Sequence, residues 1–570
     1  MIDIFTQRSR IAYFSMEIAL RPEIHTYAGG LGILAGDTMR SCADLELPVV
    51  FVTLLSRQGY LRQEIDTQGR QIEHPDPWDP ARWCQPLGAK VVVDMAGREV
   101  WVRPWLYVLR NPLGYEIPVL LLDTDLDENA PEDRTLTDVL YGDGPEYRLK
   151  QEIVLGIGGV RILRALGFDI HTWHMNEGHS ALLALDLLRR HGRTMVDASA
   201  GDVLYDVDSG REQCVFTTHT PVEAGQDRFG YDLVERVMPG FMPTSQLKLL
   251  AGSEALNMTR LALNLSGYIN GVAKRHAETS SRMFPGHRVH AITNGVHPGT
   301  WTSPGFAGLY DTRFPDWRHD PEVLVRADQL DDADVWAAHA GAKAALLQRV
   351  RDLTGVELDP EVATLGFARR MTGYKRPDLL FTDLDRLAAI HRLNPIQIVL
   401  AGKAHPRDDA GKHQVQALFG HKHAAHSAGR VVYLDDYDLG MAATLVRGCD
   451  VWVNLPRPPL EASGTSGMKN VVNGGLHLSV LDGWWPEAYD GSNGWAISGD
   501  VDGDHGAQDA RHAGDFYRLL GEEVVPTFYD GTGGPPARWL EMVRSSLATI
   551  GPKFGATRMV SDYVGRMYPA

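Results

Sequence analysis

The sequence predicts an α/β protein made of two doubly wound, Rossmann-like domains that face each other across a cleft. The chain has 570 residues, which is too long for one hydrophobic core. Short apolar runs of strand length alternate along it with segments of helical periodicity. This alternation stops at 299–334, which is rich in Pro, Gly, Asp and Trp, and then starts again. We therefore expect one domain over 1–297, a second over 298–550 and a closing helix over 551–570.

The first domain is expected to contain strands over 11–16, 49–53, 91–94, 100–109 and 119–123. A core-facing helix is expected over 148–166, where apolar residues recur at helical spacing. Two more apolar strands end in polar tips, over 170–179 and 215–224. Because open α/β sheets bind ligands beyond the carboxyl ends of their strands, His219 in the second tip is a candidate ligand contact. Packing within the loop explains this histidine equally well.

The second domain is expected to contain strands over 363–368, 396–400, 431–434 and 451–455, with a leucine-rich helix over 379–387. The preceding segment, 299–334, is interpreted as an interdomain crossing and a loop. The run 559–567 has apolar residues at i, i+1, i+4, i+5 and i+8. This spacing predicts an amphipathic helix, which in this fold class commonly returns to the first domain.

The charge of the chain excludes some classes of partner. The chain carries 56 Lys and Arg against 73 Asp and Glu, a net charge of −17, so neither nucleic acid nor an anionic membrane is expected as its main partner. Its four cysteines form no C-x-x-C pair, which argues against a disulfide framework and fits a reducing cytoplasm. We find no secretory signal and no run of about 18 apolar residues. A cytoplasmic protein is expected.

The segment 461–470, with the sequence EASGTSGMKN, is the strongest candidate for a functional site. It follows an apolar strand, and its small residues allow a ligand to approach the backbone closely. N–H groups at a helix start can hold an anion, so 465–467 is compatible with a phosphate-holding turn. Lys469 lies one helical turn after Thr465, where a desolvated amine can condense with an aldehyde cofactor. A lysine beside a phosphate cradle suggests pyridoxal phosphate, although most lysines are solvated surface charges.

Two other segments are candidate anion sites. The basic run RRMTGYKR, at 369–376, lies at the carboxyl end of a predicted strand, where anions bind, although most basic runs are solvated surface. Arginine matches phosphate oxygens with a planar fork, and lysine supplies a compact charge. The glycine-rich turn in 27–37 leads into a helical pattern, which is weak evidence by itself.

No metal site is predicted. The histidines at 171, 174 and 179 have no further ligand group at a known metal spacing, so hydrogen bonds among these tip residues are the simpler explanation. The acidic stretch 500–504 has D-x-D-x-D spacing, but glycine and glutamate are missing from the positions that a calcium loop requires.

These segments together resemble the α-glucan phosphorylases, the enzymes of glycogen, starch and maltodextrin. The segment 461–469 is similar to the family's cofactor-lysine segment, and matches to other family motifs follow in the same order: G-G-L-G at 29–32, T-H-T at 218–220, T-N-G-V-H-P at 293–298 and the basic run. The resemblance implies the GT-B fold. It also implies reversible phosphorolysis, with retention, of the non-reducing end of an α-1,4-glucan by inorganic phosphate, giving α-glucose 1-phosphate. The implied cofactor is pyridoxal 5′-phosphate, held by Lys469 as a Schiff base.

The resemblance also assigns roles to individual residues. The implied catalytic residues are Lys375, Arg370 and Lys469. The implied cofactor contacts are Lys469, Thr465, Ser466, Gly467, Arg369 and Tyr437. The implied substrate contacts are Gly30, Leu31, His219, Asn294, Glu461, Ala462, Ser463 and Gly464. Arg369, Thr372 and Asp438 depart from the larger enzymes, which have lysine, histidine and arginine there.

Two other functions compete with this one. A nucleotide-sugar-dependent glycosyltransferase of the GT-B fold, such as a glycogen or starch synthase, binds sugar and phosphate in the same kind of cleft but has no use for Lys469. A non-catalytic glucan-binding protein has no need of Arg370 or Lys375. The chain begins almost at its first predicted strand, so the amino-terminal phosphorylation and nucleotide-effector apparatus of animal enzymes is expected to be absent. Glucan length, branching, direction and oligomeric state, including a homo-oligomer, stay open.

Overall fold

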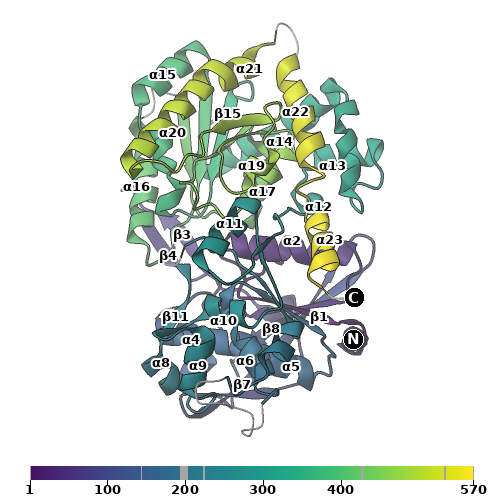
Figure 1. Ribbon diagram of the computed structural model, residues 1–570. Helices are drawn as coiled ribbons and strands as arrows, with labels where there is room; N and C mark the ends of the chain where they lie inside the picture. The colour runs from purple at the N-terminus through teal and green to yellow at the C-terminus, as the bar shows by residue number, and fades with distance from the viewer. Residues whose placement is uncertain are drawn as a thin grey trace.

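The computed structural model describes residues 2–142, 144–192, 203–222, 225–424, 429–531 and 535–568. It is a mixed α/β structure with two large sheets, each flanked by helices, and one sheet with its helices lies above the other in Figure 1. No helix in these ranges is both long enough and apolar enough to cross a membrane.

The first sheet has ten strands in the order β14-β13-β10-β9-β1-β2-β8-β7-β5, with β6 also paired to β7. The strands are β1 (Ile11–Ser15), β2 (Val49–Leu54), β5 (Gln85–Pro86), β6 (Val91–Met95), β7 (Arg98–Arg110), β8 (Glu116–Asp123), β9 (Thr172–Asn176), β10 (Cys214–Thr217), β13 (Tyr268–Gly271) and β14 (His290–Ala291). Pairing is parallel from β14 to β8 and antiparallel around β7. All five residues of β1 are buried, as expected for a central strand covered on both faces.

The second sheet has six parallel strands in the order β17-β16-β15-β18-β19-β20. They are β15 (Ala363–Ala368), β16 (Ile396–Ala401), β17 (Arg430–Leu434), β18 (Val451–Asn454), β19 (Leu476–Val480) and β20 (Gly494–Ile497). Two short antiparallel pairs lie outside the large sheets: β3 (Arg62–Ile65) with β4 (Gln71–His74), and β11 (Arg228–Gly230) with β12 (Ala255–Asn257).

The helices cover these sheets and connect their strands. They are α1 (Ile2–Arg8), α2 (Gly30–Asp44), α3 (Pro131–Arg134), α4 (Pro145–Ile153), α5 (Gly159–Ala165), α6 (Leu182–Leu188), α7 (Val207–Gln213), α8 (Tyr231–Val237), α9 (Thr244–Ala251), α10 (Met258–Asn264), α11 (Lys274–Met283), α12 (Pro298–Trp301), α13 (Pro304–Arg313), α14 (Asp332–Thr354), α15 (Leu384–Leu393), α16 (Asp409–Ala424), α17 (Leu439–Gly448), α18 (Ser466–Val471), α19 (Trp485–Ala488), α20 (His505–Leu519), α21 (Val525–Tyr529), α22 (Ala537–Ile550) and α23 (Ala556–Arg566). A π-helical turn, 154–158, joins α4 to α5, so the helix expected over 148–166 is continuous.

The segment expected to be a loop, 299–334, is largely helical. It contains most of α12, then α13, then a 3₁₀ helix at Pro321–Gln329, and the start of α14. Its proline and polar residues begin helices: Pro304 is the first residue of α13, and the Ser303 side chain caps that helix by accepting from the Phe306 N–H. The loop interpretation was wrong because these residue types favour helix starts as well as turns.

The chain crosses between the two sheets at two places that lie side by side. After β14 it passes through Val296 into α12, and after α22 it returns through Gly555 into α23. These crossings are hydrogen-bonded to each other, from the Val296 N–H to the Phe554 carbonyl (2.9 Å) and from the Ala556 N–H to the Val296 carbonyl (2.8 Å). Helix α23 then packs on α2 beside the first sheet.

The β3–β4 hairpin joins the two parts at another place, on the opposite side in Figure 1 from α23. Gln63 exchanges two hydrogen bonds of 2.9 Å with Asp436, between its backbone N–H and the carboxylate and between its amide oxygen and the Asp436 N–H. Gln71 accepts from the Ala404 N–H and donates to the Ala404 carbonyl, both at 2.9 Å. The hairpin is therefore held by paired polar contacts to the loops after β16 and β17.

Candidate active site

The basic run after β15 divides into two groups with different surroundings. Arg376 has φ +46° and is buried by its own structural contacts, donating to the carbonyls of Leu455 and Pro456 and pairing with Asp509 (2.7 Å). It holds the loop after β18 in place. Arg369 and Lys375 instead point to Glu461, so these two and Arg370 are the cations that remain for a ligand.

Glu461 lies at the centre of a buried ion cluster. Nζ of Lys375 donates to Oε1 at 2.7 Å and to Oε2 at 2.5 Å, and Nη2 of Arg369 donates to Oε2 at 3.0 Å. Burial would raise the pKa of Glu461, but Lys375 and Arg369 hold it below its usual value. Burial, with the neighbouring charge of Arg369, lowers the pKa of Lys375 to about 7.

A second carboxylate, Asp482, fixes the backbone of this segment. Its Oδ2 accepts from the Glu461 N–H at 2.9 Å, and burial raises the pKa of Asp482 to about 7. Gly483 follows at φ +60°, and a Cβ there would lie 2.2 Å from the carbonyl oxygen of Ser463. Gly464 has φ +81°, a conformation that favours glycine. The turn 461–464, which includes Ala462, therefore has a backbone shape that depends on these two glycines.

Lys469 is buried on the short helix α18, with 6% of its surface exposed. Its Nζ lies 4.0 Å from the ring centroid of Trp301, and among the described residues it has no hydrogen bond or ion pair. Burial lowers the pKa of Lys469 to about 8, so a free amine is available near neutral pH.

The turn that leads into this helix has little room for side chains. A Cβ on Gly467 would lie 2.5 Å from the ring of His477, so glycine is required there. Thr465 is the N-cap residue of α18, and Ser466 Oγ accepts from the Trp452 indole N–H at 2.9 Å.

Arg370 and Tyr437 flank the ion cluster. The Arg370 guanidinium makes no ion pair with the described residues, and its electrostatic neighbours are Tyr374 and, from the other half of the chain, Tyr60 and Glu17. Tyr437 is half-buried; burial raises its pKa, and the charge of Arg369 opposes that rise. Arg370 therefore supplies a positive charge at the boundary between the two halves.

The glycine-rich turn lies at the start of α2, where Gly30 is the first helical residue and Leu31 the second. The Glu17 carboxylate accepts from the N–H groups of Ala28 (2.5 Å) and Gly29 (3.0 Å) just before the helix. A Cβ on Gly32 would lie 2.7 Å from Glu17 Oε2, so the loop closes tightly on this carboxylate. Sequence reasoning missed Glu17, although it directly follows a predicted strand.

His219 and Asn294 both lie in the first half of the chain. His219 Nε2 is 2.7 Å from Asn176 Oδ1, its backbone N–H donates to Glu177 (2.8 Å), and burial lowers its pKa to about 3. The His219 imidazole is therefore neutral near pH 7. Asn294 is 4% exposed, and its Oδ1 is a buried acceptor without a hydrogen-bond partner among the described residues, as is Ser463 Oγ on the other half. Such unpaired groups are costly unless a polar ligand satisfies them.

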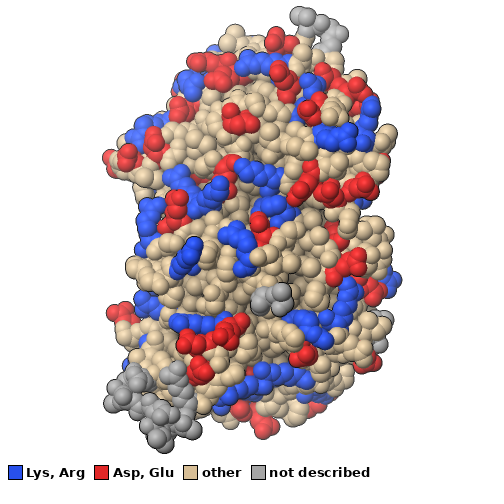
Figure 2. All heavy atoms as spheres, turned by 45° about the vertical axis from the view of Figure 1, so that its right-hand side comes forward, with Lys and Arg blue, Asp and Glu red and all other residues tan. Residues whose placement is uncertain are grey.

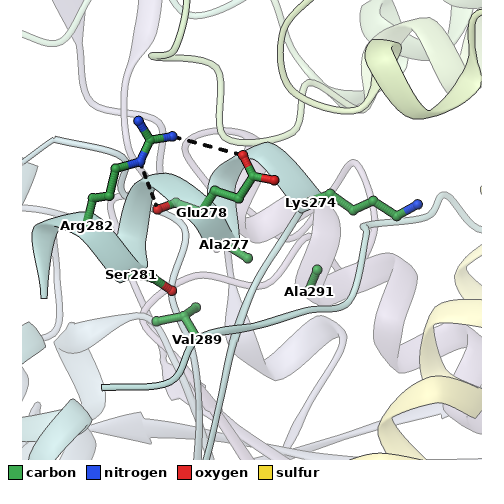
Figure 3. Close-up of a pocket in the computed structure, with 7 residues that line it drawn as sticks. All are labelled: Lys274, Ala277, Glu278, Ser281, Arg282, Val289 and Ala291. Carbon is green, nitrogen blue, oxygen red and sulfur yellow. Dashed lines mark hydrogen bonds and ion pairs between the residues drawn. The ribbon is translucent and has the colours of Figure 1, made fainter. Parts of the chain in front are cut away.

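The surface shows two further features. Lys and Arg side chains occur across the middle of the face in Figure 2, although acidic residues outnumber them in the chain. A hollow lined by α11 and by Val289 and Ala291 contains Glu278 and Arg282, which pair with each other at 4.0 Å (Figure 3). This hollow includes none of the predicted site residues.

Comparisons with known proteins show the family to which this chain belongs. A family model described as carbohydrate phosphorylase matches residues 241–487. Glycogen phosphorylase of Mycobacterium tuberculosis is 39% identical over 616 aligned residues, which cover 98% of this chain and 70% of that protein. Maltodextrin phosphorylase of Thermococcus litoralis is 36% identical, covering 98% and 70%, and glycogen phosphorylase of Aquifex aeolicus is 35% identical, covering 99% and 86%. The chain belongs to the carbohydrate phosphorylase family.

Proposed function

We propose that this chain is an α-glucan phosphorylase that cleaves the non-reducing end of an α-1,4-glucan with inorganic phosphate and releases α-glucose 1-phosphate. The observation that carries the proposal is the pairing of a buried ion cluster, Arg369 and Lys375 on Glu461, with a buried amine on Lys469 in the same half of the chain. The names of the relatives, glycogen and maltodextrin phosphorylase, support the substrate class.

The residues around Lys469 fit pyridoxal phosphate. Its amine is buried, has a pKa of about 8 and has no ion-pair partner among the described residues, which suits covalent attachment of an aldehyde. Thr465, Ser466 and Gly467 would hold the cofactor together with Lys469, Arg369 and Tyr437. When bound, the cofactor supplies a phosphate group that exchanges a proton with the substrate phosphate.

The chain's own residues then have distinct roles. Arg370 and Lys375 bind the substrate phosphate and stabilise the charge that develops during transfer. In the reaction the bond from C1 to the glycosidic oxygen breaks, a bond from C1 to a phosphate oxygen forms, and a proton passes from phosphate to the departing glucan oxygen. A protein carboxylate pair at glycosidase spacing is not required.

Sugar recognition is assigned to residues from both halves. Glu461, Ser463 and Asn294 offer acceptors to glucose hydroxyls, together with Ala462, Gly464 and the neutral His219. Gly30 and Leu31 at the start of α2 approach the phosphate. When the substrate phosphate binds, Lys375 gains a second anionic partner. Its ion pair with Glu461 is then weaker than in the free protein.

The domain organisation follows from the same proposal. We assign the GT-B arrangement, with domains over 1–297 and 298–550 and a closing segment over 551–570. Its support is two parallel-rich sheets joined by adjacent crossings, and the packing of α23 on α2. A nucleotide-sugar glycosyltransferase of this fold remains the alternative, and the buried amine of Lys469 argues against it.

The test is Lys469→Ala. We expect loss of the cofactor's absorbance band and of phosphorolysis together, because no other covalent link holds the cofactor. Lys274→Ala is the matched control, since that side chain is exposed on α11 and has no ion pair among the described residues. Full cofactor content and normal turnover in Lys469→Ala protein would falsify the assignment.

A further inference from the structure

Asp37 is a buried carboxylate that the proposed chemistry does not use. It lies in the middle of α2 and is 1% exposed. The indole N–H of Trp301 donates to both of its oxygens, at 3.0 Å to Oδ1 and 2.8 Å to Oδ2. Asp37 and Trp301 are 264 residues apart in the chain, so this contact joins the two halves.

The same indole ring lies against Lys469. Its edge faces Asp37, and its face lies 4.0 Å from Nζ of Lys469. Asn473 also connects Trp301 to Lys469, because its Nδ2 donates to the backbone carbonyls of both residues, at 2.9 Å and 2.8 Å. A negative charge at the N–H edge makes the ring face more attractive to a cation. Asp37 therefore acts on Lys469 through the indole as well as directly.

The pKa of Asp37 is raised overall, because burial outweighs the neighbouring charges that favour its ionised form. Burial raises the pKa of Asp37, while Lys469, Arg40 and His297 face it as cations or potential cations, and the Trp301 hydrogen bonds also oppose the effect of burial. Arg40 additionally donates to the carbonyls of Ala19 and Leu20, and His297 pairs with Asp44 on the same helix (2.7 Å). Asp37 is the charged group among the described residues that favours the protonated form of Lys469.

We propose that Asp37 is a positioning residue of the cofactor-lysine site, which fixes Trp301 against Lys469 and sets the pH range in which the Lys469 amine is free to react with an aldehyde. The inference rests on the proposed function, because it takes Lys469 as the cofactor lysine. It also links the site to the substrate side: Gly30 and Asp37 are two turns apart on one rigid helix, so the glycine-rich turn and the support of Lys469 move together.

The experiment measures covalent attachment rather than turnover. Full-length chain freed of bound cofactor is mixed with pyridoxal phosphate over a pH series from about 6 to about 10, a range that spans the expected titration of the amine. The Lys469 amine adds to the aldehyde carbon and water leaves, forming a C=N bond. Borohydride then adds hydride to the carbon and water protonates the nitrogen, so peptide mapping counts the trapped lysine.

Asp37→Asn keeps an acceptor for Trp301 but removes the charge. Without that charge the Lys469 pKa falls, so the midpoint of attachment should move to lower pH by about one unit, within the range for an opposite charge nearby. The ionisations of the reagent are common to all variants and cancel in this comparison. Asp37→Ser, a smaller neutral replacement, gives the same test if the asparagine variant does not fold by circular dichroism.

Two control variants separate charge from packing. Asp44→Asn removes another buried carboxylate from α2, one that pairs with His297 and Asn111, and should leave the midpoint unchanged. Trp301→Phe keeps a ring against Lys469 but removes the N–H that donates to Asp37, so its midpoint should move in the same direction by less than in Asp37→Asn. The inference is overturned if the neutral Asp37 variants keep the original midpoint, or if Asp44→Asn or Trp301→Phe shifts it equally. A chain that takes no label on Lys469 at any pH overturns the proposed function as well.

Discussion

Lys375 and Glu461 are 86 residues apart in the chain and form a two-point ion pair, with Nζ donating to both carboxylate oxygens. Arg369 is bound to the same carboxylate. The Glu461 carboxylate thus holds both Lys375 and Arg369, two cations that the proposed chemistry requires. Glu461 itself belongs to the segment proposed to bind sugar. The positions of the phosphate-binding and sugar-binding groups therefore depend on each other.

Lys375→Ala should leave the cofactor attached and collapse phosphorolysis. Losing one preorganised charge at a developing anion costs about 2.7–4 kcal/mol, roughly a hundred- to a thousand-fold in rate. The rate is measured at saturating phosphate, with the absorbance band as the check on cofactor content. Lys412→Ala, which removes a partly exposed lysine paired with Glu73, should change the rate little. A drop of only a few-fold in the Lys375 variant would contradict its role as a phosphate ligand.

Glu461→Gln should weaken the use of glucose 1-phosphate in the synthetic direction. Charge-assisted hydrogen bonds are worth about 1.5–3 kcal/mol, so kcat/KM should fall about ten- to a hundred-fold. The variant also leaves Lys375 without its anion, which lowers the Lys375 pKa further and should move the pH profile of the reaction to lower pH. If the variant instead loses the cofactor and retains normal sugar dependence, Glu461 belongs to the cofactor site.

Asp482→Asn should change how stability depends on pH. Because burial raises the pKa of Asp482 to about 7, the folded chain keeps a proton between the ordinary carboxyl pKa and that value, while the unfolded chain has lost it. The contribution of this proton to the free energy of unfolding is fully present below the ordinary carboxyl pKa and is lost as pH rises through about 7. Each pH unit in this window is worth about 1.4 kcal/mol, so roughly 2 kcal/mol should be lost between about pH 5 and pH 7.

Asparagine resembles the protonated acid and should not show this loss. Urea unfolding of both proteins at the two pH values is the measurement, and the advantage of the unaltered chain over the variant should shrink by that amount. Parallel stability curves would show that Asp482 is ionised throughout and that its proton does not contribute.

Much of the secondary structure could be predicted because it depends on local patterns. Parallel strands buried on both faces are short apolar runs, and β1, β15 and β18 were found where such runs occur. The glycine-rich turn was correctly expected to lead into a helix, α2. The family was also recognisable from motifs that each lie within about ten residues, which is the scale of a loop that contacts a ligand.

The contacts between distant segments could not be predicted. Nothing near Asp37 in the sequence indicates that it meets Trp301, and nothing near Trp301 indicates that it covers Lys469, because these contacts exist only after both halves have folded and met. Arg376 shows the opposite limit. It has the same side chain as Arg369 and Arg370 in the basic run, but its positive φ and its carbonyl contacts direct it into the structure instead of toward a ligand.

The paired crossings at Val296 and Gly555 have a mechanical consequence. Because the two chain segments are adjacent and hydrogen-bonded to each other, they form a single hinge. This hinge permits rotation of one half relative to the other but resists twisting. The β3–β4 hairpin lies on the far side of this hinge. The paired contacts of Gln63 and Gln71 must break before the two halves can move apart there.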